Sequence, residues 1–272
     1  MGERKGSGAG VRPAVVKLGG SIVTDKRGGE PIVRLATVER LAKEIASARP
    51  KRLVVVHGAG SFGHPIVERH DLLGRLHDDA WRLSWAETQC WQNILNVQIT
   101  ATLGRAGIPA VPCQPSAMAV MHHRRLIRMD LAAIEGMLAE GLVPVLFGVP
   151  AFDEGDGCSI LSGDVIAPFV AAKLRLGRVI HATDVDGVFE ADPHSMPKAK
   201  RCPRVDRKSW PAVRRMLLGS ASIDVTDGML GKMAALMDWT RVGVRARIVD
   251  GNTPGRLRDA LLGKAVGTEV RA

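Results

Sequence analysis

Short apolar runs that stop abruptly at glycine recur along this chain, and they narrow the choice of fold more than any other feature. The run at residues 14–18 ends at Gly19-Gly20-Ser21, and the run at 53–56 ends in the glycine-rich stretch 57–64. Between them, apolar residues repeat at helical spacing over 35–45, which predicts an amphipathic helix. Strand, helix and strand, with glycine after each strand, is typical of a parallel α/β sheet.

The alternation of strands and helices continues through the rest of the sequence. We expect further helices near residues 81–103, 130–140, 164–174 and 211–217, and one through Trp239. We expect further strands at residues 110–111, 143–147, 179–182 and 247–249. We expect a turn at 153–157, a loop or small hairpin at 191–207 and a loop at 220–228. The pattern therefore predicts an α/β fold without a clean linker between domains.

Composition narrows the class of protein. Of the 272 residues, 46% are apolar, which is enough for a compact globular core. No stretch approaches the roughly 20 uninterrupted apolar residues that a membrane-spanning helix needs. Residues 1–12 are polar and glycine-rich, so we expect a disordered tail there, without the apolar core of a signal peptide.

The cysteines indicate the compartment. They are widely spaced, with no CxxC pair and no histidine at zinc-finger spacing: Cys90, Cys113, Cys158 and Cys202. Free thiols suit a reducing environment. We therefore expect a cytoplasmic protein without a metal site made by its own side chains.

The formal net charge of +10 indicates an anionic partner without identifying it. Nucleic acid, an anionic membrane surface and small anionic substrates are all compatible with such a charge. Basic residues form short groups, such as Lys51-Arg52 and 122–125, without interleaved aromatic residues. We interpret these groups as solvated surface, and expect neither nucleic acid nor a membrane as partner.

Three glycine turns predict where a small anion would bind. They are Gly19-Gly20-Ser21, residues 58–63 and Ser162-Gly163-Asp164 at a helix start. Glycine lets backbone N–H groups approach an anion closely, and a helix N-terminus adds a favourable dipole. Because parallel sheets bind ligands beyond the carboxyl ends of their strands, these turns should converge on one crevice.

Lysines near these turns favour phosphate as the anion. Lys17 interrupts an otherwise apolar strand, where a buried charge is costly unless it meets a negative partner. Lys26 and Lys232, each taken alone, would be ordinary surface lysines. The chain has no P-loop signature, no dinucleotide-binding fingerprint and no G-x-S-x-G elbow. Phosphoryl transfer is the chemistry favoured by the residues that remain, which are glycines, lysines, carboxylates and a histidine.

These segments resemble the amino acid kinase superfamily, and within it the isopentenyl phosphate kinases. The matching segments, in the family's order, are residues 16–21 with Asp25-Lys26, 57–65, 114–116, 162–164, 182–188, and 222–226 with Gly228-Met229 and Lys232. The histidine that closes Gly58-Ala59-Gly60-Ser61-Phe62-Gly63-His64 is the more specific feature, because it marks the phosphate-monoester branch.

The resemblance implies a fold and a reaction. It implies a three-layer αβα sandwich with a mainly parallel central sheet, forming a single domain over 13–272. An N-terminal lobe, about 13–175, would bind the phosphate acceptor, and a C-terminal lobe, about 176–272, would bind ATP. The γ-phosphoryl group of ATP would pass to isopentenyl phosphate and give the diphosphate. Magnesium would accompany ATP, and the chain would form a homodimer.

Site residues follow from the same resemblance. The lysines would neutralise the transferring group, Asp164 would orient them, and His64 would hydrogen-bond the acceptor's phosphate. The implied catalytic residues are Lys17, Lys26, His64, Asp164 and Lys232. The implied ATP-binding residues are Lys17, Gly19, Gly20, Ser21, Gly60, Asp184, Phe189, Gly228 and Lys232. The implied substrate-binding residues are Ala59, His64, Gly163, Trp85 and Ile160. No metal ligand is predicted, and the other seven histidines, His181 among them, are expected to be structural.

Departures from the family's pattern keep other functions open. Thr88 is more polar than expected on the helix that would cover the isoprenoid tail, and Val149-Pro150 replaces a usual aspartate. Asp227 stands where the family commonly has glycine. The first two favour, as an alternative, a kinase for another small phosphate or phosphonate such as fosfomycin. A nucleotide-binding regulatory protein is the non-enzymatic alternative.

Overall fold

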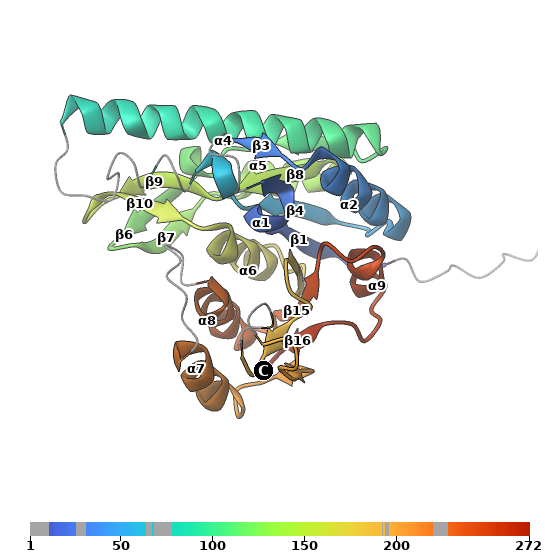
Figure 1. Cartoon of the computed structure of the whole chain (residues 1–272). Coiled ribbons are helices and arrows are strands. Elements are labelled where there is room, and N and C mark those ends of the chain that lie inside the picture. The colour runs from blue at the N-terminus through green and yellow to red at the C-terminus, as the bar shows by residue number, and fades with distance from the viewer. Residues whose placement is uncertain are drawn as a thin grey trace, which may run out of the picture.

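The computed structural model describes residues 11–25, 31–63, 67, 78–191, 193, 196–219 and 228–272. An eight-stranded sheet runs through the molecule (Figure 1). Its strands are β1 (Ala14–Leu18), β4 (Leu53–His57), β5 (Ala110–Pro112), β8 (Val143–Phe147), β11 (Arg178–Thr183), β14 (Arg204–Val205), β15 (Arg245–Asp250) and β16 (Thr268–Val270). Their order is β14-β16-β15-β11-β1-β4-β8-β5, so an early strand, β1, lies in the interior of the sheet.

The central strands of this sheet are parallel. From β15 to β5 every neighbouring pair is parallel, while β16 runs antiparallel to β15. All five residues of β1 and of β4 are buried, as expected for strands covered on both faces. The mainly parallel central sheet is therefore confirmed.

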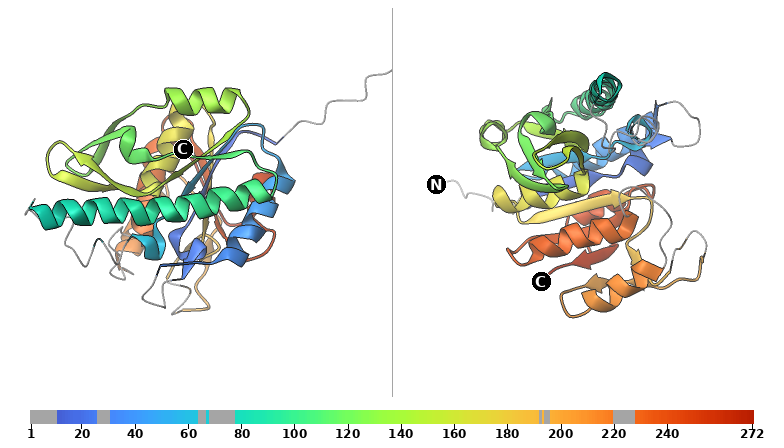
Figure 2. Two further views of the ribbon diagram at one scale, coloured as in Figure 1. Left: turned by 90° about the horizontal axis from the view of Figure 1, so that it is seen from above. Right: turned by 90° about the vertical axis from the view of Figure 1, so that its left-hand side faces the viewer.

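Helices cover both faces of the sheet and make three layers (Figures 1 and 2). One face packs against α2 (Leu35–Ala48), α4 (Asp79–Arg105) and α9 (Arg256–Leu261). The other packs against α5 (Ala132–Ala139), α6 (Gly163–Lys173) and α8 (Gly228–Thr240). Alternation along β1 explains both cores, because Val16 and Leu18 face the first set of helices and Val15 faces the second. The predicted αβα sandwich is confirmed.

A second sheet lies beside α4 at one end of the molecule (Figure 1). Its strands are β6 (Ala119–His122), β7 (Arg125–Met129), β9 (Val149–Asp153) and β10 (Gly157–Leu161). The order is β10-β9-β6-β7. Strand β9 continues from β8 after Gly148, so this sheet extends the molecule beyond the carboxyl end of the main sheet. The turn at 153–157 forms as predicted, whereas the four strands around it were not predicted.

A buried carboxylate ties the two hairpin turns of the second sheet together. The Asp153 carboxylate accepts backbone N–H bonds from His123, Arg124, Gly155 and Asp156 at 2.8–3.1 Å. His123 and Arg124 have φ of 45° and 64°, the left-handed conformation of a tight hairpin turn. Burial opposes ionisation of Asp153, but these donors hold its pKa well below the usual range. The pair His123-Arg124 therefore closes a turn and is exposed, as the sequence analysis predicted for this basic group.

Most predicted elements are present, with boundaries shifted by a few residues. The predicted loop or hairpin at 191–207 contains β13 (Arg201–Cys202), which pairs with β12 (Val188–Phe189). Helix α7 (Trp210–Gly219) forms as predicted and packs on α8, whereas α9 and β16 were not predicted. The remaining short elements are α1 (Gly20–Val23), β2 (Thr24–Asp25), β3 (Ile32–Val33), and two 3₁₀ turns, Gly60–Phe62 and Pro115–Ala117. Nearly all of the expected tail, 1–12, and of the expected loop, 220–228, lies outside the described residues.

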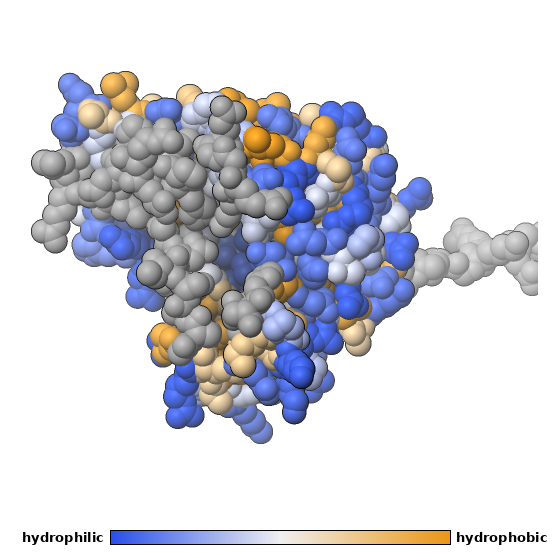
Figure 3. Space-filling view, viewed as in Figure 1, coloured by the Kyte–Doolittle hydropathy of each residue, from blue (hydrophilic) through white to orange (hydrophobic). Residues whose placement is uncertain are grey.

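The described surface is mostly polar and the cysteines are free thiols, as the sequence predicts. Polar residues cover most of the described surface in the view of Figure 3, with apolar residues in small groups. All four cysteines lie in the described part of the chain and are free thiols, Cys113 and Cys158 being buried. Of the helices that the structure describes, none combines the length and the apolar character that crossing a membrane requires.

Candidate active site

The glycine turns meet at the carboxyl edge of the main sheet. Backbone bonds join each turn to the neighbouring strand: Gly19 N–H donates to Ala182 O at 2.8 Å, and Gly58 N–H donates to Leu18 O at 2.9 Å. Gly148, after β8, donates to His57 O at 3.0 Å, and the third turn lies against the same carbonyl, because a Cβ added to Gly163 would lie 3.2 Å from it. The predicted convergence of these turns is therefore present in the structure.

Two of the turns touch backbone to backbone, and this contact requires glycine. A Cβ atom on Gly20 would lie 2.6 Å from the backbone nitrogen of Gly60, closer than real Cβ contacts allow. Gly60 itself has a φ of 53°, a backbone conformation that residues other than glycine rarely adopt. Thr24 fastens the contact, because its Oγ1 donates to Gly20 O at 2.8 Å and accepts from Ser61 N–H at 3.0 Å. The floor of the site is thus made of closely packed main chain.

Two lysines and an aspartate gather beside this floor. Lys17 Nζ, from β1, lies 2.7 Å from Asp164 Oδ1. Lys232 Nζ, from α8, lies 3.1 Å and 3.0 Å from Asp164 Oδ1 and Oδ2. Asp164 stands in the first turn of α6, and Ser162 Oγ caps that helix by accepting from the Asp164 N–H at 3.2 Å. We call Lys17, Asp164 and Lys232 the lysine–aspartate cluster.

The lysine–aspartate cluster is buried, and burial sets its electrostatics. The side chains of Lys17, Asp164 and Lys232 are only 7%, 14% and 8% exposed. Burial lowers the pKa of Lys17 to about 8, with Asp164 opposing and Lys232 reinforcing the shift. Burial alone would raise the pKa of Asp164, but the two lysines hold it well below its usual range. Two ammonium groups against one carboxylate leave a surplus positive charge, which suits an incoming phosphate.

Two buried histidines lie on the strands next to β1: His181 is on the same sheet face as the lysine–aspartate cluster, and His57 is on the opposite face, toward α4. His57 is fully bonded: Asn96 Nδ2 donates to its Nε2 at 3.0 Å, so its Nδ1–H donates to Gly58 O at 3.0 Å. Burial lowers the pKa of His57 to about 4. His181 on β11 pairs in register with Lys17, and its Nδ1 lies 3.4 Å from Asp164 Oδ1. The predicted structural role suits His57. The sequence gives no signal that His181 lies beside Lys17, because this depends on the register between β1 and β11.

The residues predicted to bind ATP lie near the same edge without forming one cluster in the described structure. Gly19, Gly20 and Ser21 follow β1, and Gly228 opens α8 one turn before Lys232, with a φ of 50°. Two other predicted residues, Asp184 and Phe189, are not fully buried. Asp184 follows β11, is exposed and accepts from Thr183 Oγ1 at 3.0 Å, while Phe189 is half-buried in β12. Their roles toward ATP stay predictions.

The predicted acceptor residues divide between the glycine floor and a separate apolar group. Ala59 lies in the turn after β4, and Gly163 is the first residue of α6. Trp85 and Ile160 pack against a small cluster of Val67, Trp81 and Cys158 between α4 and β10. The rings of Trp81 and Trp85 meet edge to face, with centroids 5.2 Å apart. The roles of both groups toward an acceptor stay predictions.

The departures at Thr88 and Val149-Pro150 are both accommodated within the fold. Thr88 is buried, and its hydroxyl donates to Ser84 O at 2.7 Å within α4, so its polarity is satisfied by its own helix. Val149 and Pro150 begin β9, and Pro150 O accepts from Gln89 Nε2 at 3.0 Å. Lys26, His64 and Asp227 lie outside the described residues.

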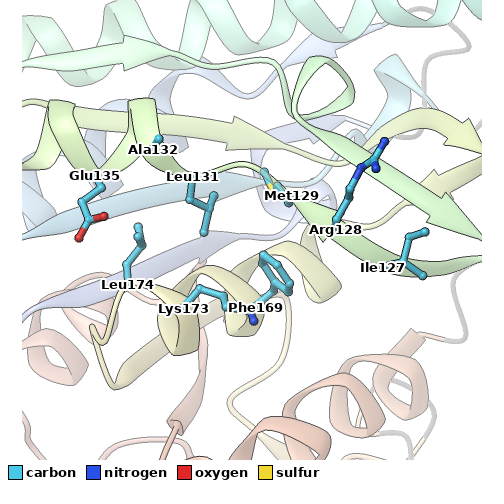
Figure 4. Close-up of a pocket in the computed structure, with 9 residues that line it drawn as sticks. All are labelled: Ile127, Arg128, Met129, Leu131, Ala132, Glu135, Phe169, Lys173 and Leu174. Atoms are coloured by element: carbon cyan, nitrogen blue, oxygen red, sulfur yellow. The ribbon is translucent and has the colours of Figure 1, made fainter.

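A groove of about 430 Å³ lies elsewhere, between β7, α5 and the carboxyl end of α6 (Figure 4). Arg128, Glu135 and Lys173 lie around it, and Lys173 Nζ stands 5.7 Å from the Phe169 ring centroid. Because the lysine–aspartate cluster is at the opposite end of α6, this groove is separate from it. Over the described ranges, no group of three or more His, Cys, Asp or Glu side chains could hold a metal ion.

Comparison with known proteins adds to this geometry. A family model described as the amino acid kinase family matches residues 12–250. The isopentenyl phosphate kinase of Methanothermobacter thermautotrophicus is 36% identical, over 94% of this chain and 98% of its own. That of Methanocaldococcus jannaschii is 33% identical, over 94% and 97%. A solved structure of isopentenyl phosphate kinase matches with a TM-score of 0.82 at 34% identity, over 94% of this chain and 99% of that one. The family match spans the whole lysine–aspartate cluster.

Proposed function

The chain belongs to the amino acid kinase family, and we propose that it transfers the γ-phosphoryl group of ATP to isopentenyl phosphate. The products are ADP and isopentenyl diphosphate. The observation that carries the proposal is the likeness, over nearly the whole chain, to isopentenyl phosphate kinases. The lysine–aspartate cluster on a glycine floor supports it, since phosphoryl transfer depends mainly on positioning and charge neutralisation.

The chemistry requires no general base. The acceptor oxygen belongs to a phosphate monoester that is already ionised near neutral pH, because its second pKa is about 6. Lys17 and Lys232 neutralise charge that spreads over the transferring group, and Asp164 holds both ammonium groups at 2.7–3.1 Å until phosphate arrives. Backbone N–H groups of the glycine turns position the phosphates. Lys26 would add a third cation, and His64 would donate a hydrogen bond to the acceptor's phosphate.

Two lobes on one sheet divide the substrates in this proposal. The N-terminal lobe, about 13–175, would bind isopentenyl phosphate, with Trp85 and Ile160 next to its tail. The C-terminal lobe, about 176–272, would bind ATP through Asp184, Phe189 and Gly228. Support comes from the order of the sheet, in which β1 from one lobe pairs directly with β11 from the other. The phosphates would then meet at Lys17, on the boundary.

Magnesium fits this site as a companion of the nucleotide. Asp164, the carboxylate of the cluster, already contacts both lysines, and the described residues offer no other carboxylate group around it that could cage a cation. Mg²⁺ keeps several waters and often binds through substrate phosphates. Phosphate-bound Mg²⁺ would supply further charge neutralisation between donor and acceptor. The chain's own share is the pair of lysines.

Location and assembly are part of the same proposal. The four free thiols support a reducing compartment, and hence the cytoplasm. A homodimer is proposed from the family resemblance. Most of the +10 charge comes from residues outside the lysine–aspartate cluster, such as the group 122–125, and the proposed catalysis does not explain it.

The alternatives make different predictions in one assay. Purified protein with ATP, Mg²⁺ and isopentenyl phosphate should yield ADP and isopentenyl diphosphate, resolved by anion-exchange chromatography. Dimethylallyl phosphate, geranyl phosphate and fosfomycin, tested beside it, should give lower kcat/KM. A higher kcat/KM with fosfomycin would support the phosphonate kinase instead. No turnover with any of the four acceptors, despite ATP binding, would support the regulatory protein. The matched control is Lys232→Ala, which should bind ATP weakly and lose turnover.

A further inference from the structure

We propose that His181 is a positioning residue of this kinase site. Its Nδ1–H donates a hydrogen bond to the Asp164 carboxylate when the lysines turn from that carboxylate toward phosphate oxygens. The proposal rests on the proposed phosphoryl transfer but goes beyond it, because it concerns a side chain for which the family resemblance implies no role. It would apply to any phosphate acceptor.

The position of His181 is unusual for a polar residue. On the sheet face that packs against α6 and α8, its neighbours are Val179 on the same strand and Ile248 in register on β15. Its register partner on β1 is Lys17. The inward-facing positions around it are thus apolar, except toward the lysine–aspartate cluster. His181 is completely buried.

Neither ring nitrogen of His181 has a hydrogen-bond partner among the residues that the structure describes. His57, on the other side of β1 and equally buried, bonds through both nitrogens. Leaving buried polar atoms unpaired costs free energy, and an aliphatic residue of similar size would avoid that cost. Packing therefore does not explain His181, and a partner that forms during the reaction does.

Asp164 is the available partner. His181 Nδ1 lies 3.4 Å from Asp164 Oδ1, the oxygen that Lys17 contacts at 2.7 Å. The charged groups that face the imidazole are Lys17 from β1, Asp164 from α6 and Lys232 from α8, while β15 presents Ile248. Burial and the two lysines keep the pKa of His181 well below its usual value. The ring is thus neutral near neutral pH and has one N–H to donate.

The arrangement of the cluster shows when that donor is needed. Both lysines contact the carboxylate, so catalysis requires at least one ammonium group to turn toward a phosphate oxygen. The buried carboxylate then loses a donor. A small movement of Asp164 toward Nδ1–H would replace it and keep the carboxylate beside the remaining lysine. Loss of this donor should lower kcat more than it raises KM, because the lysines still bind substrate but are held less well.

Amide variants and an aliphatic variant test the donor at Nδ1. The Asn side-chain nitrogen lies about where Nδ1 lies, whereas that of Gln lies closer to Nε2. We expect His181→Leu to lower kcat about tenfold, with KM for both substrates nearly unchanged and Tm equal or higher. His181→Asn should recover most of kcat despite a lower Tm, and His181→Gln should not. Val179→Ala, a packing change on the same strand and face, should lower Tm and leave kcat within about twofold.

The possible results distinguish failure of the positioning role of His181 from failure of the proposed function. If His181→Leu keeps full kcat, or if the Asn and Gln variants are equally active, the positioning role is wrong. Turnover is measured with whichever acceptor the wild-type protein uses best, so a different acceptor overturns only the proposed function. A readout without turnover is the ¹⁵N spectrum of the His181 ring in the full chain with a non-hydrolysable ATP analogue. We expect the Nδ1–H tautomer with a downfield proton, and the Nε2–H tautomer would contradict the proposal.

Discussion

Lys17 Nζ lies 2.7 Å from Asp164 Oδ1, although β1, which carries Lys17, is otherwise a wholly apolar strand. Lys232 binds the same carboxylate from α8. A buried cation that meets a carboxylate from a different element is costly to retain for stability alone, because apolar residues often serve as well. This cost agrees with the proposed role of the cluster, in which the two lysines neutralise an anion.

Replacing Asp164 by Asn should test that arrangement. Asn keeps the volume but leaves two buried ammonium groups without their counter-ion. We expect a loss of about 3 kcal/mol in the free energy of unfolding at neutral pH. We expect kcat to fall at least about a hundredfold, because the lysines lose the group that orients them. Urea unfolding and steady-state kinetics measure the two effects. Unchanged kcat in a folded variant would contradict the role of Asp164.

The pH dependence of kcat/KM should report Lys17. Its pKa is lowered to about 8 in the folded protein, so the free enzyme loses this cation above that pH. We expect kcat/KM to fall with one proton between about pH 8 and 10, since kcat/KM reports ionisations of the free enzyme. A profile that stays flat to about pH 9.5 would show that Lys17 is not needed as a cation.

The expected fall in kcat/KM at high pH is not caused by a loss of folding stability when Lys17 deprotonates. The folded pKa of about 8 is lower than the value of 10.5 for an unperturbed lysine. Between these values the unfolded chain holds the proton and the folded chain does not, so the contribution of Lys17 to stability rises with pH. Thermal unfolding followed over the same pH range is the control for other groups.

Gly20→Ala should disturb the floor of the site. The added Cβ would lie 2.6 Å from the Gly60 nitrogen and 2.8 Å from its Cα, so two main-chain segments must separate. We expect about 2 kcal/mol of destabilisation, as for overpacking, and a marked loss of kcat. Gly136→Ala on α5 is the matched control, since nothing lies within 4 Å of its added Cβ. That control should gain about 0.5–1 kcal/mol, and equal behaviour of the two variants would argue against the contact.

Asp153→Ala should loosen the second sheet. The carboxylate accepts four backbone N–H bonds that close two turns, and alanine leaves them unpaired. We expect a loss of about 3 kcal/mol or more, because several donors lose their acceptor together. Differential scanning calorimetry measures it. Asp153→Asn, which keeps one acceptor oxygen, should lose less, and a reversed order would contradict this account.

Local patterns were sufficient to predict six strands of the main sheet, from β15 to β5. Residues 14–18 and 53–56 are apolar runs bounded by glycine, and the helix at 35–45 has one apolar side, so each could be recognised within a few residues. The second sheet was missed because β6 and β7 carry histidine or arginine beside their apolar residues, so neither is an apolar run bounded by glycine. Strand β16 has only three residues and depends on its pairing with β15 and β14.

The candidate site was predictable only where sequence motifs carried it. Lys17 could be noticed because a lysine is conspicuous in an apolar strand, and the resemblance added Asp164 and Lys232. His181 could not be recognised, because its significance comes from the register of β1 with β11 and from a distance to α6. Such relationships arise from tertiary packing, which no local pattern in the sequence encodes.

The interior position of β1 also bears on protein synthesis. The ribosome makes β1 before its neighbour β11 and before α8, the helix that carries Lys232. A nascent chain can therefore hold Lys17 without its counter-ion Asp164 and without Lys232, so the lysine–aspartate cluster forms only late in synthesis. A prematurely terminated chain would leave one edge of this apolar strand unpaired, in a form that chaperones and proteases recognise.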